Sequence, residues 1–209
     1  FEKSIKFFNK GIKLQKTLPD DYMKAHLLHN MSGCYGLMGN LDKRLIYLEQ
    51  SQGIYEKLDD NISLGNSYGE MGNAYKSTSN NDQSIKFYDK AKQIFISEEM
   101  NYALAQLLIL QSEVYLNMED YKKIKNNLDK ASKLSEEFDI PVMEGRIYLA
   151  YAQLYIKEEK DDEALDNLDE ALDLFMDINN KLRASDVLTM MGFIYIKKKK
   201  IRKAKKAHK

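Results

Sequence analysis

The sequence predicts an all-α fold of antiparallel helix pairs stacked as a solenoid, and three observations support this. Tyrosines recur every 40 residues, small and apolar residues recur in register with them, and the apolar spacing in between is that of a helix. Self-similarity at a period of about 20 to 50 residues is typical of arrays in which each unit buries its apolar face against its neighbours. The tyrosines in this register are Tyr35, Tyr75, Tyr115, Tyr155 and Tyr195.

Four further columns keep the same period, which matters because the chain has 14 tyrosines in all. Large residues stand seven positions before and thirteen after each tyrosine, and small ones three before and sixteen after. We expect the small residues to let two helix backbones approach closely while the large ones fill the space around them. The large residues are Leu28, Tyr68, Leu108, Tyr148 and Leu188, seven before the tyrosine, and Leu48, Tyr88, Leu128 and Leu168, thirteen after it. The small residues are Ser32, Gly72, Ser112, Ala152 and Gly192, three before it, and Ser51, Ala91, Ala131 and Ala171, sixteen after it.

Each period holds two stretches in which apolar residues recur at spacings of three, four and seven, as at Leu165, Leu168 and Leu172. This spacing predicts a helix with one apolar face. Short groups of polar turn-forming residues separate the stretches, so two helices fit into each repeat. The groups are Gly39-Asn40, Asp59-Asp60-Asn61, Ser79-Asn80-Asn81, Glu119-Asp120, Asp161-Asp162 and Asn179-Asn180.

The elements follow in chain order. Phe8 and Gly11 fit the later columns, so the chain opens in the second half of an earlier repeat. Pro19 and Pro141 each stand at the start of a first helix, where a missing backbone N–H costs nothing. We expect helices at 2–16, 21–38, 41–58, 62–78, 82–98, 101–118, 121–138, 142–158, 161–177, 181–198 and 200–209. The predicted domain is one solenoid over 1–209, with a partial repeat at 1–18, full repeats at 19–58, 59–98, 99–138 and 139–178, and a truncated repeat at 179–209.

The best-preserved stretch, LGNSYGEMGNAYKSTSNNDQSIKFYDKAKQIF at 64–95, and the next best, 148–175, resemble the tetratricopeptide repeat. The resemblance covers all 209 residues and is closest to the 40-residue variety of kinesin-light-chain-like, Leu-Gly-Asn-type and bacterial peptide-receptor proteins. It implies a right-handed superhelix whose first helices line a concave groove. HEAT and armadillo units lack this order of columns, and the absence of Trp and of strand alternation excludes WD40 blades. Gln111, Arg44 and Ile124 depart from the residue types of their columns.

The resemblance also implies which residues face the groove, and amides are frequent among them. Asn and Gln can pair with the backbone of an extended peptide, although plain surface polarity explains such residues equally well. Asn30 and Asn73 match asparagine slots of the peptide-receptor variety. The chaperone-tail variety clamps a terminal carboxylate with several Lys, Arg and Asn residues, and here only Asn73, Lys76 and Arg146 are candidates for that role. The predicted groove residues are His26, His29, Asn30, Asn66, Asn73, Lys76, Gln106, Glu113, Arg146, Gln153, Asp186 and Phe193, with Gly33, Ile109, Leu149 and Thr189 beside them.

No catalytic residue, metal ligand set or cofactor motif stands out. The phosphate-binding and dinucleotide-binding glycine patterns, the nucleophile elbow and HExxH are all missing from the sequence. His26 and His29 share a helix face but have no third ligand at a fitting spacing. The mean hydropathy of −0.55 and the lack of a long apolar run predict no membrane span. The lone Cys34 cannot form an internal disulfide, which favours a reducing cytoplasm. The sequence therefore predicts a protein that is not an enzyme.

Charge is balanced overall, with 32 basic and 32 acidic side chains, but nine of the basic ones and no acid fall within 197–209. Ile201 and Ala204 keep the repeat register there, so we expect a solvated helix rather than a nucleic-acid site, because the rest of the chain is acidic. The expected function is a scaffold that binds a protein or peptide segment in its groove. One alternative is the ligand-sensing part of a larger regulator with a DNA-binding or signalling module outside these residues. Another is self-association through the exposed end repeats.

Overall fold

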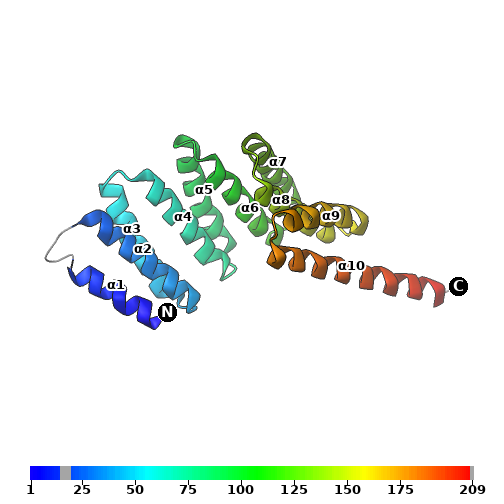
Figure 1. The fold of residues 1–209 in the computed structure, drawn as a ribbon, viewed down its shortest axis with the longest axis horizontal. Coiled ribbons are helices and arrows are strands. Elements are labelled where there is room, and N and C mark those ends of the chain that lie inside the picture. Colours follow the sequence, from blue (N-terminus) through cyan, green and yellow to red (C-terminus); the bar gives the residue numbers. More distant parts are fainter. Residues whose placement is uncertain (15–19, 208–209) are drawn as a thin grey trace. The chain divides into compact units, whose positions relative to one another are not determined.

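The computed structural model describes residues 1–14 and 20–207, with side chains through residue 199, and all regular structure within these ranges is helical (Figure 1). The predicted fold class, an all-α repeat of helix pairs, is confirmed. Residues 15 and 16 of the first predicted helix, and Pro19, lie outside the described residues. The helices are α1 (Glu2–Leu14), α2 (Asp21–Leu37), α3 (Leu41–Lys57), α4 (Asn61–Lys76), α5 (Asn81–Ser97), α6 (Asn101–Asn117), α7 (Tyr121–Phe138), α8 (Pro141–Lys157), α9 (Asp161–Asp177) and α10 (Lys181–Ala207).

Contacts divide the chain into two compact units, Phe1–Leu107 (unit 1) and Leu108–Lys209 (unit 2), so the boundary falls within α6. In unit 1, α2 pairs with α3 and α4 with α5, while α1 packs on α2 and α3 on α4. In unit 2, α8 pairs with α9, and α7 and α10 pack on α8 and α9 respectively. Each pair is thus formed by consecutive helices, as expected for a helical repeat. The single solenoid and its repeat boundaries stay a prediction.

A left-handed backbone turn recurs every 20 residues, one between each pair of helices from α2 to α10. The first is Gly39, with φ of 71°, and the others are non-glycine residues with φ between 49° and 60°. Such a residue ends a helix by turning the chain out of it. The Asp or Asn that follows often caps the next helix, as Asn40 does by accepting the Lys43 N–H at 3.1 Å. The non-glycine residues are Asp59, Ser79, Glu99, Glu119, Asp139, Glu159 and Asn179.

The next position in this series, Lys199, is helical, and α10 runs without a break to Ala207. The prediction of separate helices at 181–198 and 200–209 is therefore wrong. The segment from 197 to 207 contains no Gly, Asn, Asp or Pro, so no residue there favours a turn over a helix. Lys197 and Lys198 also pair with Asp161 and Asp162, which holds this part of α10 beside the start of α9. The turn expected at Asp161-Asp162 lies instead just before α9, at Glu159 and Lys160.

Most column residues of the full helix pairs lie in the core, as predicted, whereas Tyr68, Tyr75, Tyr148 and Tyr155 are half-buried. The large and small residues that follow each tyrosine are completely buried wherever they lie in a full helix pair, with 0% of Leu48, Ala91 and Leu168 exposed. A Cβ on Gly72 would lie 2.3 Å from the Tyr88 ring, so this small residue permits the close crossing of α4 and α5. In α10 the tyrosine column and the large column seven positions before it are uncovered, and Leu188 and Tyr195 are each 54% exposed. Burial of a first helix therefore depends on the second helix of its own repeat.

Residues that depart from the columns are accommodated locally. Ile124 is buried in place of a small residue, and the buried Gln111 accepts a hydrogen bond from Asn127 Nδ2 at 3.1 Å. Arg44 crosses toward α4 next to Gly36, where a Cβ would lie 3.0 Å from its Cδ. These departures change packing at single sites without interrupting the repeat.

Candidate functional site

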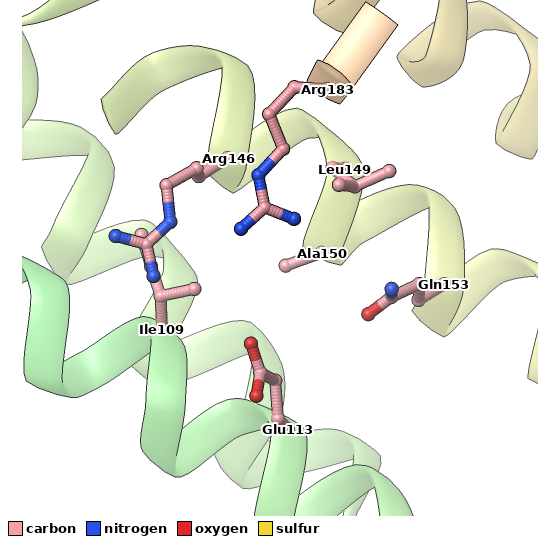
Figure 2. Close-up of a pocket in the computed structure, with 7 residues that line it drawn as sticks. All are labelled: Ile109, Glu113, Arg146, Leu149, Ala150, Gln153 and Arg183. Atoms are coloured by element: carbon pink, nitrogen blue, oxygen red, sulfur yellow. The ribbon is translucent and has the colours of Figure 1, made fainter. Parts of the chain in front are cut away.

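A small pocket in unit 2 gathers residues from three first helices, α6, α8 and α10 (Figure 2). Its volume is about 70 Å³, enough for a few waters or for the end of one side chain. The buried side chains of Ile109, Leu149 and Ala150 supply its apolar part. Its polar part is two guanidinium groups, a carboxylate and an amide. The complete lining is Ile109, Glu113, Arg146, Leu149, Ala150, Gln153 and Arg183.

Helical spacing places these side chains. Ile109 and Glu113 lie one turn apart on α6, and Arg146 and Gln153 lie two turns apart on α8, so each pair shares a helix face. Gly145, next to Arg146 and about 100° away around the helix, faces α9, where a Cβ would lie 2.8 Å from the Phe175 ring. The close packing of α8 on α9 thus fixes the direction in which Arg146 points. Arg183 lies in the first turn of α10, and its backbone N–H donates to Oδ1 of the capping residue Asn180 at 3.3 Å.

Charged side chains of both signs line the pocket. Arg146 and Arg183 contribute two positive charges and Glu113 one negative charge. Arg183 Nη1 also lies 3.6 Å from Asp186 Oδ2, with both side chains about half exposed. An exposed pair at this distance contributes little to stability, so Arg183 can exchange it for another anion.

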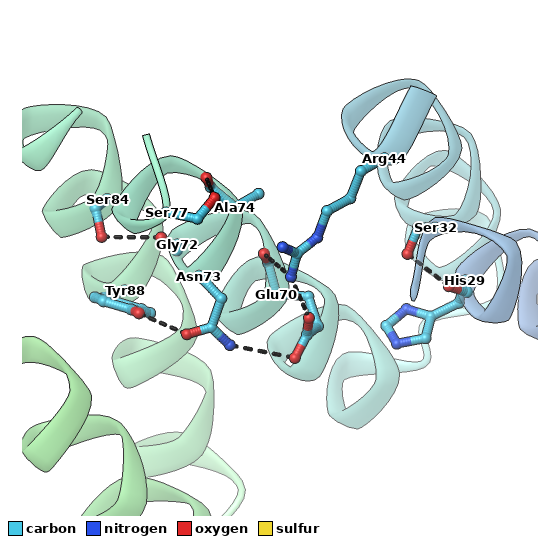
Figure 3. A network of polar contacts seen from close by, with 10 residues as sticks. All are labelled: His29, Ser32, Arg44, Glu70, Gly72, Asn73, Ala74, Ser77, Ser84 and Tyr88. Atoms are coloured by element: carbon cyan, nitrogen blue, oxygen red, sulfur yellow. Dashed lines mark hydrogen bonds and ion pairs between the residues drawn. The ribbon is translucent and has the colours of Figure 1, made fainter. Parts of the chain in front are cut away.

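A second group of polar side chains connects the helices of unit 1 (Figure 3). Arg44 Nη2 donates to Glu70 Oε2 at 2.7 Å, and Asn73 Nδ2 donates to Glu70 Oε1 at 3.2 Å. The Tyr88 hydroxyl completes this polar chain by donating to Asn73 Oδ1 at 2.7 Å. Both ends of the Asn73 amide are therefore in use within the protein. A peptide backbone at Asn73 would have to use the remaining N–H and lone pair.

His26 and His29 lie beside this polar chain on α2. His26 Nδ1 is 3.4 Å from the Tyr55 hydroxyl, and both imidazole rings contact the Tyr55 ring edge-on. Burial lowers the pKa of His29, with further lowering by His26 and Arg44, against the raising effect of Glu70. Burial also raises the pKa of Tyr55 to about 12, helped by Asp60 and Tyr22. Both shifts favour the neutral side chain, as expected for groups withdrawn from water.

The lowered pKa of His29 predicts that the protein loses stability when the pH falls below the ordinary histidine value of 6.5. The folded state binds this proton less readily than the unfolded state, so the stability is present above that pH and declines as the pH falls toward the folded-state pKa. We expect His29→Gln to remove this component. Urea unfolding of both proteins from pH 8 to 5 should show wild type losing more stability than the variant. If the stabilities of the two proteins changed in parallel with pH, His29 would have the same pKa in the folded and the unfolded state.

Compared with the prediction, the structure brings three of the twelve groove residues into one pocket: Glu113, Arg146 and Gln153. It adds Ala150 and Arg183, which the sequence interpretation missed. Arg183 could have been found, because it lies one turn before the predicted Asp186 on the same face of α10. The other nine lie outside the pocket lining: Asn30, Asn66, Asp186 and Phe193 are exposed, and His26, His29, Asn73, Lys76 and Gln106 are half-buried.

Within the described part of the chain, no three His, Cys, Asp or Glu side chains are placed to hold a metal ion together. No helix described there combines the length and the apolar character needed to cross a membrane.

Sequence comparison identifies the repeat. The profile of the tetratricopeptide repeat matches residues 65–95 and 145–175, which form the pairs α4–α5 and α8–α9. These two stretches are similar to the tetratricopeptide repeat. The second match contains Arg146 and Gln153, so part of the pocket lies within a stretch that matches this repeat. A comparison with curated protein sequences gave no match.

Solved structures share the helical-repeat fold of this chain. A signal transduction ATPase with numerous domains and a tetratricopeptide repeat sensor, from Pyrococcus horikoshii, is 25% identical with a TM-score of 0.78; the match covers 90% of this chain and 30% of that one. Aspartyl phosphate phosphatase F from Bacillus subtilis is 20% identical with a TM-score of 0.80, and the match covers 88% of this chain and 48% of that one. A Rap protein complexed with competence and sporulation factor is 15% identical with a TM-score of 0.75, and the match covers 98% of this chain and 61% of that one. The chain thus spans less than two thirds of each of these proteins.

Proposed function

We propose that the chain is a non-enzymatic scaffold that binds a peptide or an extended protein segment on the first helices of unit 2. The observation that carries this proposal is the pocket, because α6, α8 and α10 each contribute side chains to it. An apolar floor with a few polar groups placed around it is typical of binding sites. A solved structure with a similar fold is a Rap protein complexed with competence and sporulation factor, which supports a binding role.

The lining suits a main chain as well as a side chain. The Gln153 amide offers both a donor and an acceptor, and Glu113 can accept from a backbone N–H. These groups fix an extended segment while leaving its sequence largely free. The groove residues of unit 1, among them Asn30, are proposed as a second contact surface, to which Asn73 adds only the N–H and lone pair that Glu70 and Tyr88 leave. Neither surface requires a metal, a cofactor or a reacting group.

A selection from a displayed library of random 12-residue peptides tests this function. Wild type should enrich a peptide family that the double variant Arg146→Ala, Gln153→Ala does not retain. Lys130→Ala with Lys133→Ala is the matched control, because both lysines are exposed on α7 and lie outside the pocket lining. The control should enrich the same family as wild type. Equal enrichment by all three proteins would place binding elsewhere, and no enrichment by wild type would refute the function.

A sensor role is the second candidate, and one observation favours it. The match to the Pyrococcus horikoshii ATPase spans 90% of this chain but only 30% of that protein, which has a tetratricopeptide repeat sensor. In this case the same pocket would bind the signal, and a module outside residues 1–209 would respond to it. The complete gene product decides between the two roles: a DNA-binding or nucleotide-hydrolysing module in it supports the sensor, and repeats alone support the scaffold.

A further inference from the structure

Resting on the contact surface proposed for unit 1, we propose that His29 is a pH-sensitive switch that controls the Asn73 amide. When the His29 ring binds a proton, it takes over the Glu70 oxygen that accepts from Asn73, and the released N–H becomes available to a bound segment. The switch lies in the polar chain of unit 1, whose residues come from α2, α3, α4 and α5 (Figure 3). Mild acidity therefore strengthens peptide binding at this surface.

The hydrogen bond of the polar chain that is most easily exchanged is the one from Asn73 to Glu70. Glu70 Oε1 accepts from the neutral Asn73 amide at 3.2 Å, whereas Oε2 accepts from the Arg44 guanidinium at 2.7 Å. Arg44 also donates to the Glu70 main-chain oxygen at 3.4 Å, and its side chain is only 15% exposed, so this cation stays in place. A charged donor binds a carboxylate more strongly than a neutral amide does. A second cation beside Glu70 therefore displaces Asn73 and leaves Arg44 bound.

His29 is placed to become that second cation. Its ring points from α2 toward Glu70 on α4 (Figure 3). Its Nδ1 atom is buried and has no hydrogen-bond partner among the described residues. Protonation puts an N–H on both ring nitrogens, and a buried N–H without an acceptor is costly. Burial lowers the pKa of His29, and Glu70 is the charged neighbour with the largest effect on this pKa, which it raises by attracting the proton.

The other groups around His29 leave this role to Glu70. Besides burial, His26 on α2 and Arg44 from α3 lower the pKa of His29, as positive charges do. The Tyr55 ring of α3 contacts His29 edge-on, and burial raises the pKa of Tyr55 to about 12, so its hydroxyl stays neutral. No described group of α1, the other helix packed on α2, contributes to the shift. Because burial outweighs Glu70, the switch operates below pH 6.5, the ordinary histidine value.

Release of Asn73 from Glu70 changes what the groove offers to a ligand. The Tyr88 hydroxyl still donates to Asn73 Oδ1 at 2.7 Å, so the amide keeps its position. Both of its N–H groups can then donate to backbone carbonyls of an extended segment. One additional hydrogen bond corresponds to about three- to tenfold tighter binding. The unit 1 surface should therefore bind its segment tighter by this factor at pH 5 than at pH 8.

NMR of the complete chain, labelled with nitrogen-15, tests the switch without any peptide. The Asn73 side-chain amide signals, identified by their loss in Asn73→Ser, should shift between pH 8 and pH 5 with the same midpoint as the His29 ring signals. This shift should disappear in His29→Gln. The matched control is His26→Gln, one turn away on the same helix, which should retain the shift.

The switch would be overturned by Asn73 signals that stay constant while His29 titrates, by a His29 ring that stays neutral down to pH 5, or by a shift that persists in His29→Gln. Circular dichroism over the same range separates a bond exchange from unfolding. A loss of helix with the His29 midpoint would contradict the proposal.

A second selection extends the test to binding. The Arg146→Ala, Gln153→Ala variant should enrich peptides at pH 5 that bind about three- to tenfold more weakly at pH 8. Adding Asn73→Ala should remove this difference, and an unchanged difference would contradict the role of Asn73. No enrichment at either pH would refute the contact surface of unit 1 without affecting binding at the unit 2 pocket, because wild type would still enrich its own peptides.

Discussion

Phe175→Ala is expected to lower the free energy of unfolding by about 3–5 kcal/mol, the range for deleting a buried phenylalanine ring. Phe175 is completely buried, and its ring occupies the space that the missing side chain of Gly145 leaves on α8. Alanine would remove the ring and leave a cavity at the crossing of α8 and α9. The backbones already approach closely at this crossing, so the helices have little freedom to close the gap. Urea unfolding followed by circular dichroism measures the change.

Phe193→Ala is the control for this loss, because it removes the same ring from a site in unit 2 that is 68% exposed. It should change stability by no more than about 0.5 kcal/mol, as surface substitutions do. If Phe175→Ala were equally mild, the packing of α8 on α9 described above would be incorrect.

Gly72→Ala should destabilise the protein by about 1–3 kcal/mol through overpacking. The added methyl would lie 2.3 Å from the ring of Tyr88, which is completely buried and cannot swing aside. The Tyr88 hydroxyl is also held by Asn73, so moving the ring would disturb the polar chain of unit 1. The same urea titration reports the effect.

Gly69→Ala on the same helix is expected to change the stability in the opposite direction. A Cβ on Gly69 meets no atom within 4 Å, so alanine should stabilise α4 by about 0.5–1 kcal/mol through its better helix propensity. A gain from both substitutions would show that α4 and α5 are not closely packed at Gly72.

Much of the fold could be predicted from the sequence, because the period specifies both burial and turns. The columns containing Leu48, Ala91 and Leu168 are buried as expected, and the turns separate helices of the predicted lengths. The prediction failed at Lys199, where the period calls for a turn but the local sequence does not supply one. Periodicity describes what a repeat does when every position has a suitable residue, and strong helix formers at 197–207 prevail over it.

The candidate site was less predictable, because it depends on contacts between helices. Glu113, Arg146 and Gln153 could be assigned to one face from their spacing, but their convergence with Arg183 follows from how α8, α9 and α10 pack. From the sequence, Asn73 was expected to contact a bound peptide, because it matches an asparagine slot of the peptide-receptor variety. Its hydrogen bonds to Glu70 and Tyr88 arise because the core residue Tyr88 carries a hydroxyl that reaches the face of α4.

Photo-crosslinking of a selected peptide tests the central claim, peptide binding on the first helices of unit 2, most directly. A diazirine group placed in the middle of the peptide would be activated on the wild-type protein, and mass spectrometry would locate the attached residues. We expect attachment within 108–116, 143–154 and 181–186, the parts of α6, α8 and α10 that surround the pocket. Attachment confined to α7 and α9, or to residues 1–107, would contradict the account.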